Sequence, residues 1–294
     1  MPPLRRMLLI TGASGVVGHR VAHLLAARGT RARLMARDPG KVQAPPGCEV
    51  VAGDYADPAS LAAPFRGINT ALIVSGYARE GDRARLHGHA ISAAAHAGVR
   101  HLVYLSFQGA SPSSRFPMAR DHALTEGLLA ASGVPYTALR DSLYLDVIPH
   151  LFDRDGVVRG PAGAGRAAFV SREDVAQTVV AVLLQPPAAS GALDVTGPEA
   201  LSLYDVAARV SGLVGRPLRY EDETVEAGRR WRATSGAPDW EVETWLGSYL
   251  AQAAGEVEPV SETVTRLTGR VPLTLEQHFA QFPEQLAPLR VGPR

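Results

Sequence analysis

The sequence predicts an α/β fold in which a doubly wound parallel sheet is joined to a smaller, mainly helical C-terminal region. Four observations lead to this prediction. Short apolar runs alternate with helix-length patterns from the N-terminus onward, and a glycine-rich turn links the first run to the first helix pattern. The alternation weakens after about residue 141, and the chain of 294 residues is longer than most single domains, so a second region is expected.

The expected strands are short and rich in β-branched or bulky apolar residues, as buried strands usually are. They lie near residues 7–13, 31–36, 48–52, 70–74, 101–107, 136–140 and 192–196. Between the first two, Val16, Val17, Val21, Leu24 and Leu25 share one face of a helix that should stop at Gly29. Helical crossovers of this kind give a parallel sheet.

The later part of the chain has helix-like patterns around residues 203–214, 240–254 and 274–282. Ser171, followed three residues later by Asp174, resembles a capping box that opens another helix. The strand-like run ALDVT at 192–196 comes late and should rejoin the sheet.

Composition limits the partners. A formal net charge of +1, with 20% charged and 46% hydrophobic residues, gives no reason to expect nucleic acid or a membrane surface as a partner. No stretch approaches the roughly 18 apolar residues of a membrane span, and the N-terminal MPPLRRMLLI lacks the features of a signal peptide. The single cysteine, Cys48, fits a reducing compartment, so a cytoplasmic location is expected. A homodimer is kept as one candidate assembly.

The strongest local motif is the turn in MLLITGASGVVGHRVAHLL. Glycines at the start of a helix permit a tight turn and let a pyrophosphate approach the backbone amides at the positive end of that helix. The strand before the turn and the amphipathic helix after it are the context in which such a motif is meaningful. We therefore expect a dinucleotide to bind along residues Gly12, Ala13, Ser14, Gly15, Val16, Val17 and Gly18. The alternative is a purely structural turn in another α/β protein.

The choice between NADP and NAD is made at the end of the second strand, in LMARDPGK. An acid there usually binds the ribose hydroxyls of NAD, whereas a base holds the 2'-phosphate of NADP. Arg37 occupies this place, and a guanidinium suits a phosphate well. NADPH is therefore the expected cofactor and NAD the less favoured one. In the alternative interpretation, Arg37 is a solvated loop residue and Asp38 takes the ribose.

Together with TGASGVVG and Arg37, the segments GDYADPASL, YLSFQGA and HALTEGLLAASGVPYTALRDSLY resemble the atypical short-chain dehydrogenase/reductases. The branch that they resemble contains the NmrA-like proteins, the type 2 NAD(P)H:quinone oxidoreductases and the triphenylmethane reductases. The resemblance runs over most of the chain. It implies a Rossmann domain over residues 1–140, rejoined by about 172–196, and a substrate-binding region formed by 141–171 and 197–294.

The resemblance also implies roles for individual residues. Asp54 and Tyr55 would lie by the adenine, and Ser75 and Gly76 would follow the ribose and phosphates of the cofactor. Three residues at the end of the fifth strand would border the nicotinamide: Ser106, Phe107 and Gln108. Simpler roles stay open, because Asp54 could cap the following helix and Ser106 could satisfy the end of a strand.

The catalytic pair of ordinary members of this superfamily is absent. Those enzymes use Tyr-x-x-x-Lys, in which the lysine lowers the pKa of the tyrosine so that it can pass on a proton. Lys41 is the only lysine here and has Arg37 four residues before it, so the pair cannot exist. The helix position that otherwise holds the lysine is taken by His122, with Met118 in place of the tyrosine. His122 could hold the nicotinamide ribose, relay a proton, or only cover the start of the helix; Glu126, one turn later, could pair with it.

A quinone or an extended cationic dye needs little help from a general acid. The negative charge that arrives with the hydride is delocalised over the quinone or neutralises the positive charge of the dye. Such an acceptor requires mainly a slot that holds it against the nicotinamide. Candidates for that slot are aromatic: Phe107, Tyr144, Phe152 and Phe169, of which Phe169 is better explained as core. Tyr144 joins His122 as a catalytic candidate. The preferred function is thus an NADPH-dependent reductase of quinones or similar conjugated small molecules.

Two other expectations complete the sequence-based prediction. The alternative function is a regulator like NmrA, which would bind a dinucleotide and a partner protein without turnover. No metal is expected, because His87, His89 and His96 on one predicted helix lack an accompanying cluster of carboxylates.

Overall fold

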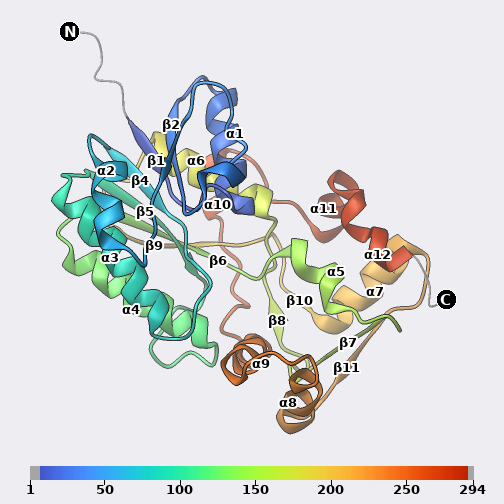
Figure 1. The fold of residues 1–294 in the computed structure, drawn as a ribbon. Helices are drawn as coiled ribbons and strands as arrows, with labels where there is room; N and C mark the ends of the chain where they lie inside the picture. Colours follow the sequence, from blue (N-terminus) through green and yellow to red (C-terminus); the bar gives the residue numbers. More distant parts are fainter. Residues whose placement is uncertain (1–6, 291–294) are drawn as a thin grey trace.

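A seven-stranded parallel sheet forms the centre of the computed structural model, which describes residues 7–290 (Figure 1). In chain order its strands are β1 (Leu8–Ile10), β2 (Ala32–Ala36), β3 (Glu49–Ala52), β4 (Thr70–Ile73), β5 (His101–Phe107), β6 (Tyr136–Asp141) and β9 (Gly191–Val195). Their order across the sheet is β3-β2-β1-β4-β5-β6-β9. The doubly wound α/β prediction is therefore confirmed, and the late strand does rejoin the sheet. Residues 1–6, part of the segment judged not to be a signal peptide, lie outside the described residues.

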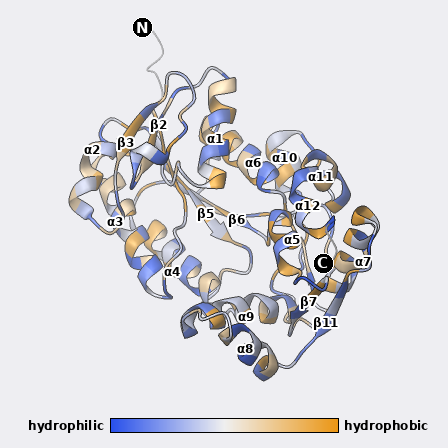
Figure 2. Ribbon diagram, turned by 45° about the vertical axis from the view of Figure 1, so that its right-hand side comes forward, coloured by the Kyte–Doolittle hydropathy of each residue, from blue (hydrophilic) through white to orange (hydrophobic). Residues whose placement is uncertain are grey.

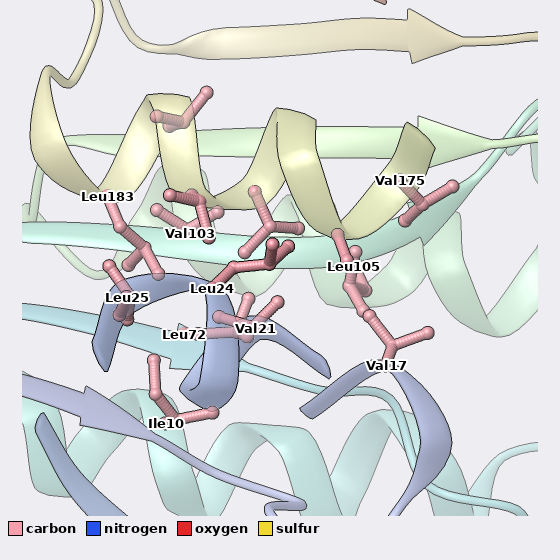
Figure 3. Close-up of a cluster of buried hydrophobic side chains, with 14 of the residues drawn as sticks. Ile10, Val17, Val21, Leu24, Leu25, Leu72, Val103, Leu105, Val175 and Leu183 are labelled. Carbon is pink, nitrogen blue, oxygen red and sulfur yellow. The ribbon is translucent and has the colours of Figure 1, made fainter. Parts of the chain in front are cut away.

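Helices cover both faces of the sheet (Figure 1). One face carries α1 (Val16–Ala27) and α6 (Arg172–Leu184), and the other carries α2 (Ala62–Phe65), α3 (Asp82–His96) and α4 (Pro117–Ala131). Short 3-10 turns η1 (Pro39–Lys41) and η2 (Pro58–Leu61) follow β2 and β3. The side chains between α1, α6 and the sheet form one buried aliphatic cluster, shown in Figure 3. The apolar face that defined α1 in the sequence is therefore its buried face.

The helices α1 and α6 run side by side in the same direction. Arg20 binds Glu173 through two bonds of 2.6 and 2.9 Å, and further along, Arg28 Nη2 donates to Gln177 Oε1 at 3.0 Å. Their first turns therefore lie at the same end of the sheet. Ser171 caps α6 as expected, since its Oγ accepts from Glu173 N. The capping box does not form, because Asp174 instead accepts the backbone amide of Leu273 at 2.8 Å.

The rest of the chain makes the second region, with two small strand pairs among its helices. It contains η3 (Leu145–Val147), α5 (Ile148–Leu151), β7 (Val157–Gly160), β8 (Arg166–Ala167), β10 (Leu201–Ser202), α7 (Leu203–Val214), β11 (Arg219–Asp222), α8 (Val225–Ala233), α9 (Asp239–Ala253), α10 (Thr263–Thr268), α11 (Leu275–Gln281), η4 (Pro283–Leu286) and α12 (Ala287–Arg290). Strand β10 pairs antiparallel with β8, and β11 pairs parallel with β7. The three helices expected in the tail are confirmed as α7, α9 and α11. The exact division into two domains stays a prediction.

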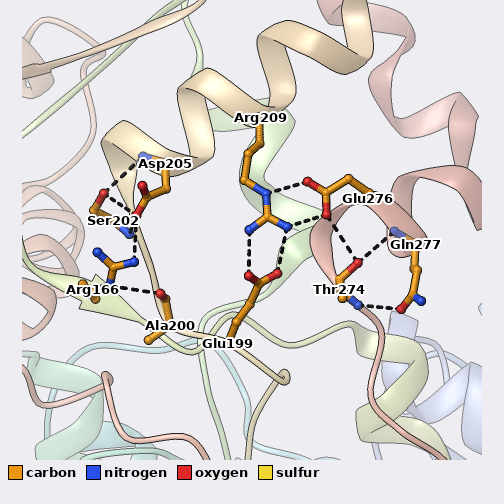
Figure 4. Close-up of polar contacts among 9 residues, drawn as sticks. All are labelled: Arg166, Glu199, Ala200, Ser202, Asp205, Arg209, Thr274, Glu276 and Gln277. Atoms are coloured by element: carbon orange, nitrogen blue, oxygen red, sulfur yellow. Dashed lines mark hydrogen bonds and ion pairs between the residues drawn. The ribbon is translucent and has the colours of Figure 1, made fainter.

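Polar contacts hold the helices of this second region together. Arg209 of α7 binds Glu276 of α11 and also Glu199, which precedes β10, as Figure 4 shows. The capping boxes that the chain does form begin α7, with Ser202, and α11, with Thr274. Most helices carry both hydrophobic and hydrophilic residues (Figure 2), as expected when one side of a helix packs on a core. Within residues 7–290 no helix is long and apolar enough to cross a membrane.

Candidate functional site

The glycine-rich loop joins β1 to α1 and is shaped by close backbone contacts. Gly12 has a φ of +59°, which disfavours side chains, and a Cβ there would lie 3.0 Å from Val74 Cβ. A Cβ on Gly18 would lie 2.4 Å from the carbonyl oxygen of Gly12. The cap residue of α1 is Gly15, which offers no side-chain hydrogen bond to the first turn. The loop therefore leaves the amides of a helix N-terminus open to an anion, so these residues fit the pyrophosphate of a dinucleotide.

A cavity of about 280 Å³ opens beside this loop, at the carboxyl ends of β1 to β4. Of the residues expected to bind the cofactor, it is lined by Gly12, Ser14, Gly15, Arg37, Asp54, Tyr55, Ser75 and Gly76. The sequence did not single out the other lining residues: Met35, Ala36, Gly53, Val74, Tyr77 and Leu86. Ala36 is the last residue of one predicted strand and Gly53 follows another. That position at a strand end is the sequence feature that could have marked them as lining residues. Ala13, Val17 and Gly18 are buried behind the loop, whereas Val16 is 63% exposed and lines a neighbouring hollow.

The charges near the end of β2 favour the interpretation based on Arg37. Arg37 is exposed, lines the cavity and has no ion pair with any residue from 7 to 290. Asp38 is already engaged, since its Oδ1 accepts from Gly40 N at 3.0 Å and its Oδ2 lies 3.8 Å from Lys41 Nζ. The guanidinium of Arg37 has free donors for the 2'-phosphate of NADP. The carboxylate of Asp38 is already used as a cap, so it is less suited to bind a ribose.

Two predicted adenine-side residues already have structural bonds. The hydroxyl oxygen of Tyr55 lies 2.5 Å from Thr11 Oγ1, and burial raises the pKa of Tyr55. Asp54 Oδ1 accepts the amide of Ala56 at 2.9 Å, while Asp57, not Asp54, caps the helical turn that follows. Both residues therefore border the cavity, but the Tyr55 hydroxyl and Asp54 Oδ1 are already hydrogen-bonded within the protein.

At the end of β5, the three residues expected near the nicotinamide differ in their surroundings. Ser106 donates to Glu126 Oε1 at 2.6 Å, and Glu126 in turn pairs with Arg140, so Glu126 does not pair with His122. Gln108 donates through Nε2 to the carbonyl of Pro259, and its buried Oε1 has no partner among the described residues. Phe107 packs edge-on against Phe116. None of the three lines the cavity beside the glycine loop.

His122 is buried within α4, and both of its ring nitrogens are engaged. Nδ1 lies 2.8 Å from the hydroxyl of Tyr104, and Nε2 lies 3.1 Å from Nη2 of Arg83. Because the guanidinium can only donate, Nε2 must accept, and the ring proton sits on Nδ1, from which it is donated to Tyr104. Burial, together with the positive charge of Arg83, lowers the pKa of His122 well below its usual value. The histidine is a neutral, held group with no spare nitrogen for a substrate.

Arg83, which sequence reasoning missed, is the centre of this buried polar group. It is 3% exposed and donates to the carbonyl of Gly76 at 2.8 Å as well as to His122. His87 accepts from the amide of the same Gly76 at 3.2 Å, and burial lowers the pKa of His87 to about 3. The backbone of Gly76, in the loop that lines the cavity, is thereby held through both its amide and its carbonyl.

The second catalytic candidate, Tyr144, forms a tight pair at the end of β6. Its hydroxyl donates to Asp141 Oδ2 at 2.5 Å, and the guanidinium of Arg172 lies 4.6 Å from the centre of its ring. Burial raises the pKa of Asp141 to about 7. Burial raises the pKa of Tyr144 too, so the tyrosine keeps its proton at any physiological pH. Among residues 7–290, no cluster of three or more histidine, cysteine or acidic side chains is placed to hold a metal ion.

A fold with this strand order, and a cavity that joins a glycine-rich loop to the ends of β2, β3 and β4, defines a dinucleotide-binding protein. A family model described as NAD(P)H-binding matches residues 12–186, more than half of the chain, so the protein belongs to the NAD(P)H-binding family. The resemblance to the NmrA-like and quinone oxidoreductase branch is confirmed.

The chain is 35% identical over 288 residues to the (4-alkanoyl-5-oxo-2,5-dihydrofuran-3-yl)methyl phosphate reductase of Streptomyces griseus, covering 96% of this chain and all of that one. It is 30% identical over 284 residues to quinone oxidoreductase 2 of Escherichia coli strain K12, covering 94% and 98% of the two chains. The crystal structure of the NADPH-dependent quinone oxidoreductase QOR2 of Escherichia coli complexed with NADPH superposes with a TM-score of 0.85 at 29% identity, over 94% of this chain and all of that one. The protein is therefore an NAD(P)H-dependent reductase acting on a small molecule, and the regulator alternative is not favoured.

Proposed function

We propose that the protein uses NADPH to reduce small conjugated acceptors, such as quinones or alkenes conjugated to a carbonyl group. The observation that carries this proposal is the state of His122, which stands where ordinary short-chain reductases have their lysine. It is buried and neutral, and both of its nitrogens are bonded to protein groups. A simple ketone needs an acid at its oxygen during hydride transfer, whereas a conjugated acceptor spreads the incoming charge over several atoms.

The two curated relatives support this acceptor class. One is named for a quinone, and the other for a dihydrofuranone whose ring double bond is conjugated to a carbonyl group. Bound NADPH would supply the hydride, and a proton from solvent would complete a two-electron reduction that leaves NADP⁺. The residues of this chain would orient the acceptor and exclude water. Phe107 and Phe152 are buried in one apolar cluster of the second region, and Tyr144 packs against the cluster between α1, α6 and the sheet.

The test is a panel of matched acceptors mixed with purified protein and NADPH, followed by absorbance at the nicotinamide band. Quinones and conjugated enones should be reduced, and saturated ketones of the same size should not. Reduction of the saturated ketones at comparable rates would show that an acid is present after all. Tight NADPH binding without oxidation by any acceptor would return the protein to the regulator alternative.

The preference for NADPH is tested separately at Arg37. If its free guanidinium holds the 2'-phosphate, Arg37→Ala should weaken NADPH binding about tenfold or more and leave NADH binding nearly unchanged. An unchanged ratio of the two affinities would refute this assignment. A cytoplasmic location is also part of the proposal; it is supported by the single free Cys48, which fits a reducing compartment.

A further inference from the structure

A hollow of about 650 Å³ lies on the α6 side of the glycine-rich loop. It is lined by Ser14, Gly15 and Val16 from the loop, by Arg172 at the start of α6, and by Phe282 and Gln285 from the end of the chain. The loop therefore faces two spaces, the predicted adenosine cavity on one side and this hollow on the other.

Arg172 is held in place without an anionic partner. Its guanidinium carbon lies 4.6 Å above the centre of the Tyr144 ring, and its backbone amide donates to Asp146 Oδ2 at 2.9 Å. None of the hydrogen bonds or ion pairs described for residues 7–290 uses its guanidinium. A cation stacked on an aromatic ring keeps its edge donors free for a ligand in the plane of the guanidinium.

Among the described residues, no carboxylate forms an ion pair with the guanidinium of Arg172, although its charge also acts on the buried Asp141. Glu173 is occupied by Arg20 through two short bonds, and Asp146 is occupied by the amide of Arg172 itself. His19 adds no anion, and burial, followed by the charges of His23 and Arg20, lowers its pKa. Of the three cations that line the hollow, Arg20 is paired with Glu173 and Lys41 lies 3.8 Å from Asp38, whereas the guanidinium of Arg172 has no ion pair among the described residues.

The position of this charge points to its ligand. The parallel α1 and α6 start at the same end of the sheet, and Figure 3 shows Val17 of α1 and Val175 of α6 at that shared end, on either side of Leu105. Tyr144, on which Arg172 stacks, packs against the same cluster. Arg172 therefore lies across from the open amides of the glycine-rich loop, and both face the same hollow.

We propose that Arg172 binds the pyrophosphate of the dinucleotide from the α6 side, opposite the amides of α1. A diphosphate has more anionic oxygens than one helix N-terminus can bind, and a planar guanidinium can take two of them at once. The arginine is then a binding residue for the cofactor, supplied by the segment that joins the predicted substrate region to the sheet. This inference rests on dinucleotide binding at the glycine-rich loop.

Isothermal titration calorimetry on Arg172→Gln tests the proposal without using turnover. Three probes separate the phosphates: NADPH, ADP-ribose, which has the pyrophosphate but no 2'-phosphate, and adenosine 2'-monophosphate, which has no pyrophosphate. The substitution should weaken NADPH and ADP-ribose about tenfold and leave adenosine 2'-monophosphate within twofold. Arg172→Lys should recover part of the loss. Arg154→Gln, which removes an exposed charge elsewhere on the surface, is the matched control and should change none of the three affinities.

The opposite outcomes are distinct. Unchanged affinity for ADP-ribose would overturn the pyrophosphate assignment while leaving the reductase proposal intact. An equal loss for all three probes would also overturn it, because the effect would then be a general change in the site. If wild-type protein bound neither NADPH nor ADP-ribose, the reductase proposal would fail with it.

Discussion

Replacing Asp141 by asparagine should change how the stability of the protein depends on pH. Asp141 is 5% exposed at the end of β6, and its only described side-chain partner is the Tyr144 hydroxyl, at 2.5 Å. Burial raises its pKa from 3.8 to about 7, although the bond from Tyr144 and the charges of Arg172 and Arg83 act in the opposite direction. The folded protein therefore holds a proton on this carboxyl at pH values where the unfolded chain has lost it.

The sign of the effect follows from this difference. Between pH 4 and pH 7 the folded state binds more protons at Asp141 than the unfolded state, so the free energy of unfolding falls as the pH rises and levels off above about 7. The gap between 3.8 and about 7, at about 1.4 kcal/mol per pH unit, sets an upper limit of about 4 kcal/mol for this loss. Asparagine keeps an oxygen for the Tyr144 hydroxyl but carries no charge.

Urea unfolding of both proteins between pH 5 and pH 9 measures the effect. Asp141→Asn should be more stable than wild type above pH 7, and the difference should shrink toward pH 5. Asp174, whose pKa burial raises to about 6, titrates in both proteins and cancels from the difference. Parallel pH curves for the two proteins would refute the reasoning, and so would a wild type that gains stability relative to the variant as the pH rises.

Two further outcomes test the site itself. Gly18→Ala would place a methyl carbon 2.4 Å from the carbonyl oxygen of Gly12, so NADPH binding measured by calorimetry should weaken at least tenfold, whereas Gly212→Ala, in open space on α7, should leave it unchanged. The His122 ring should stay neutral, with its proton on Nδ1, in ¹⁵N NMR spectra from pH 5.5 to 8, because burial and Arg83 oppose a second proton; a titration in that range would contradict the hydrogen-bond assignment.

The sheet could be predicted from sequence because each strand carries its own signal. Buried parallel strands are continuous apolar runs, whereas ALDVT, far along the chain, forms an edge strand that is only partly buried and was assigned from its short strand-like pattern. The small pairs of the second region could not. Strand β7 pairs with β11, which begins at Arg219, and four-residue strands with such distant partners leave no periodicity to read. The polar helix α8 was missed because its apolar face is narrow.

The site divides in the same way. The glycine-rich loop and Arg37 are local motifs, so their place in the chain was enough to propose them as binding residues. Arg83 and His87 sit in the run DRARLHGH, which looks like the solvated face of a helix. Both are buried because α3 packs against α4, which supplies Thr125 and His122, while Tyr104 of β5 lies beside the same histidines. The pattern of residues within one segment cannot predict contacts between side chains of different helices and strands.

This packing also bears on the absence of the Tyr–Lys pair. The buried positive charge near this part of α4 belongs to Arg83 on α3, whose Nη2 lies 3.1 Å from Nε2 of His122, the residue expected at the lysine position. From there it cannot activate a tyrosine at the substrate, since its bonds go to His122 and to the backbone of Gly76 and Met118. It can, however, fix the loop that borders the cofactor cavity. Arg83 therefore holds the geometry of this loop and delivers no proton, and a site of this kind suits acceptors for which orientation, rather than acid catalysis, limits hydride transfer.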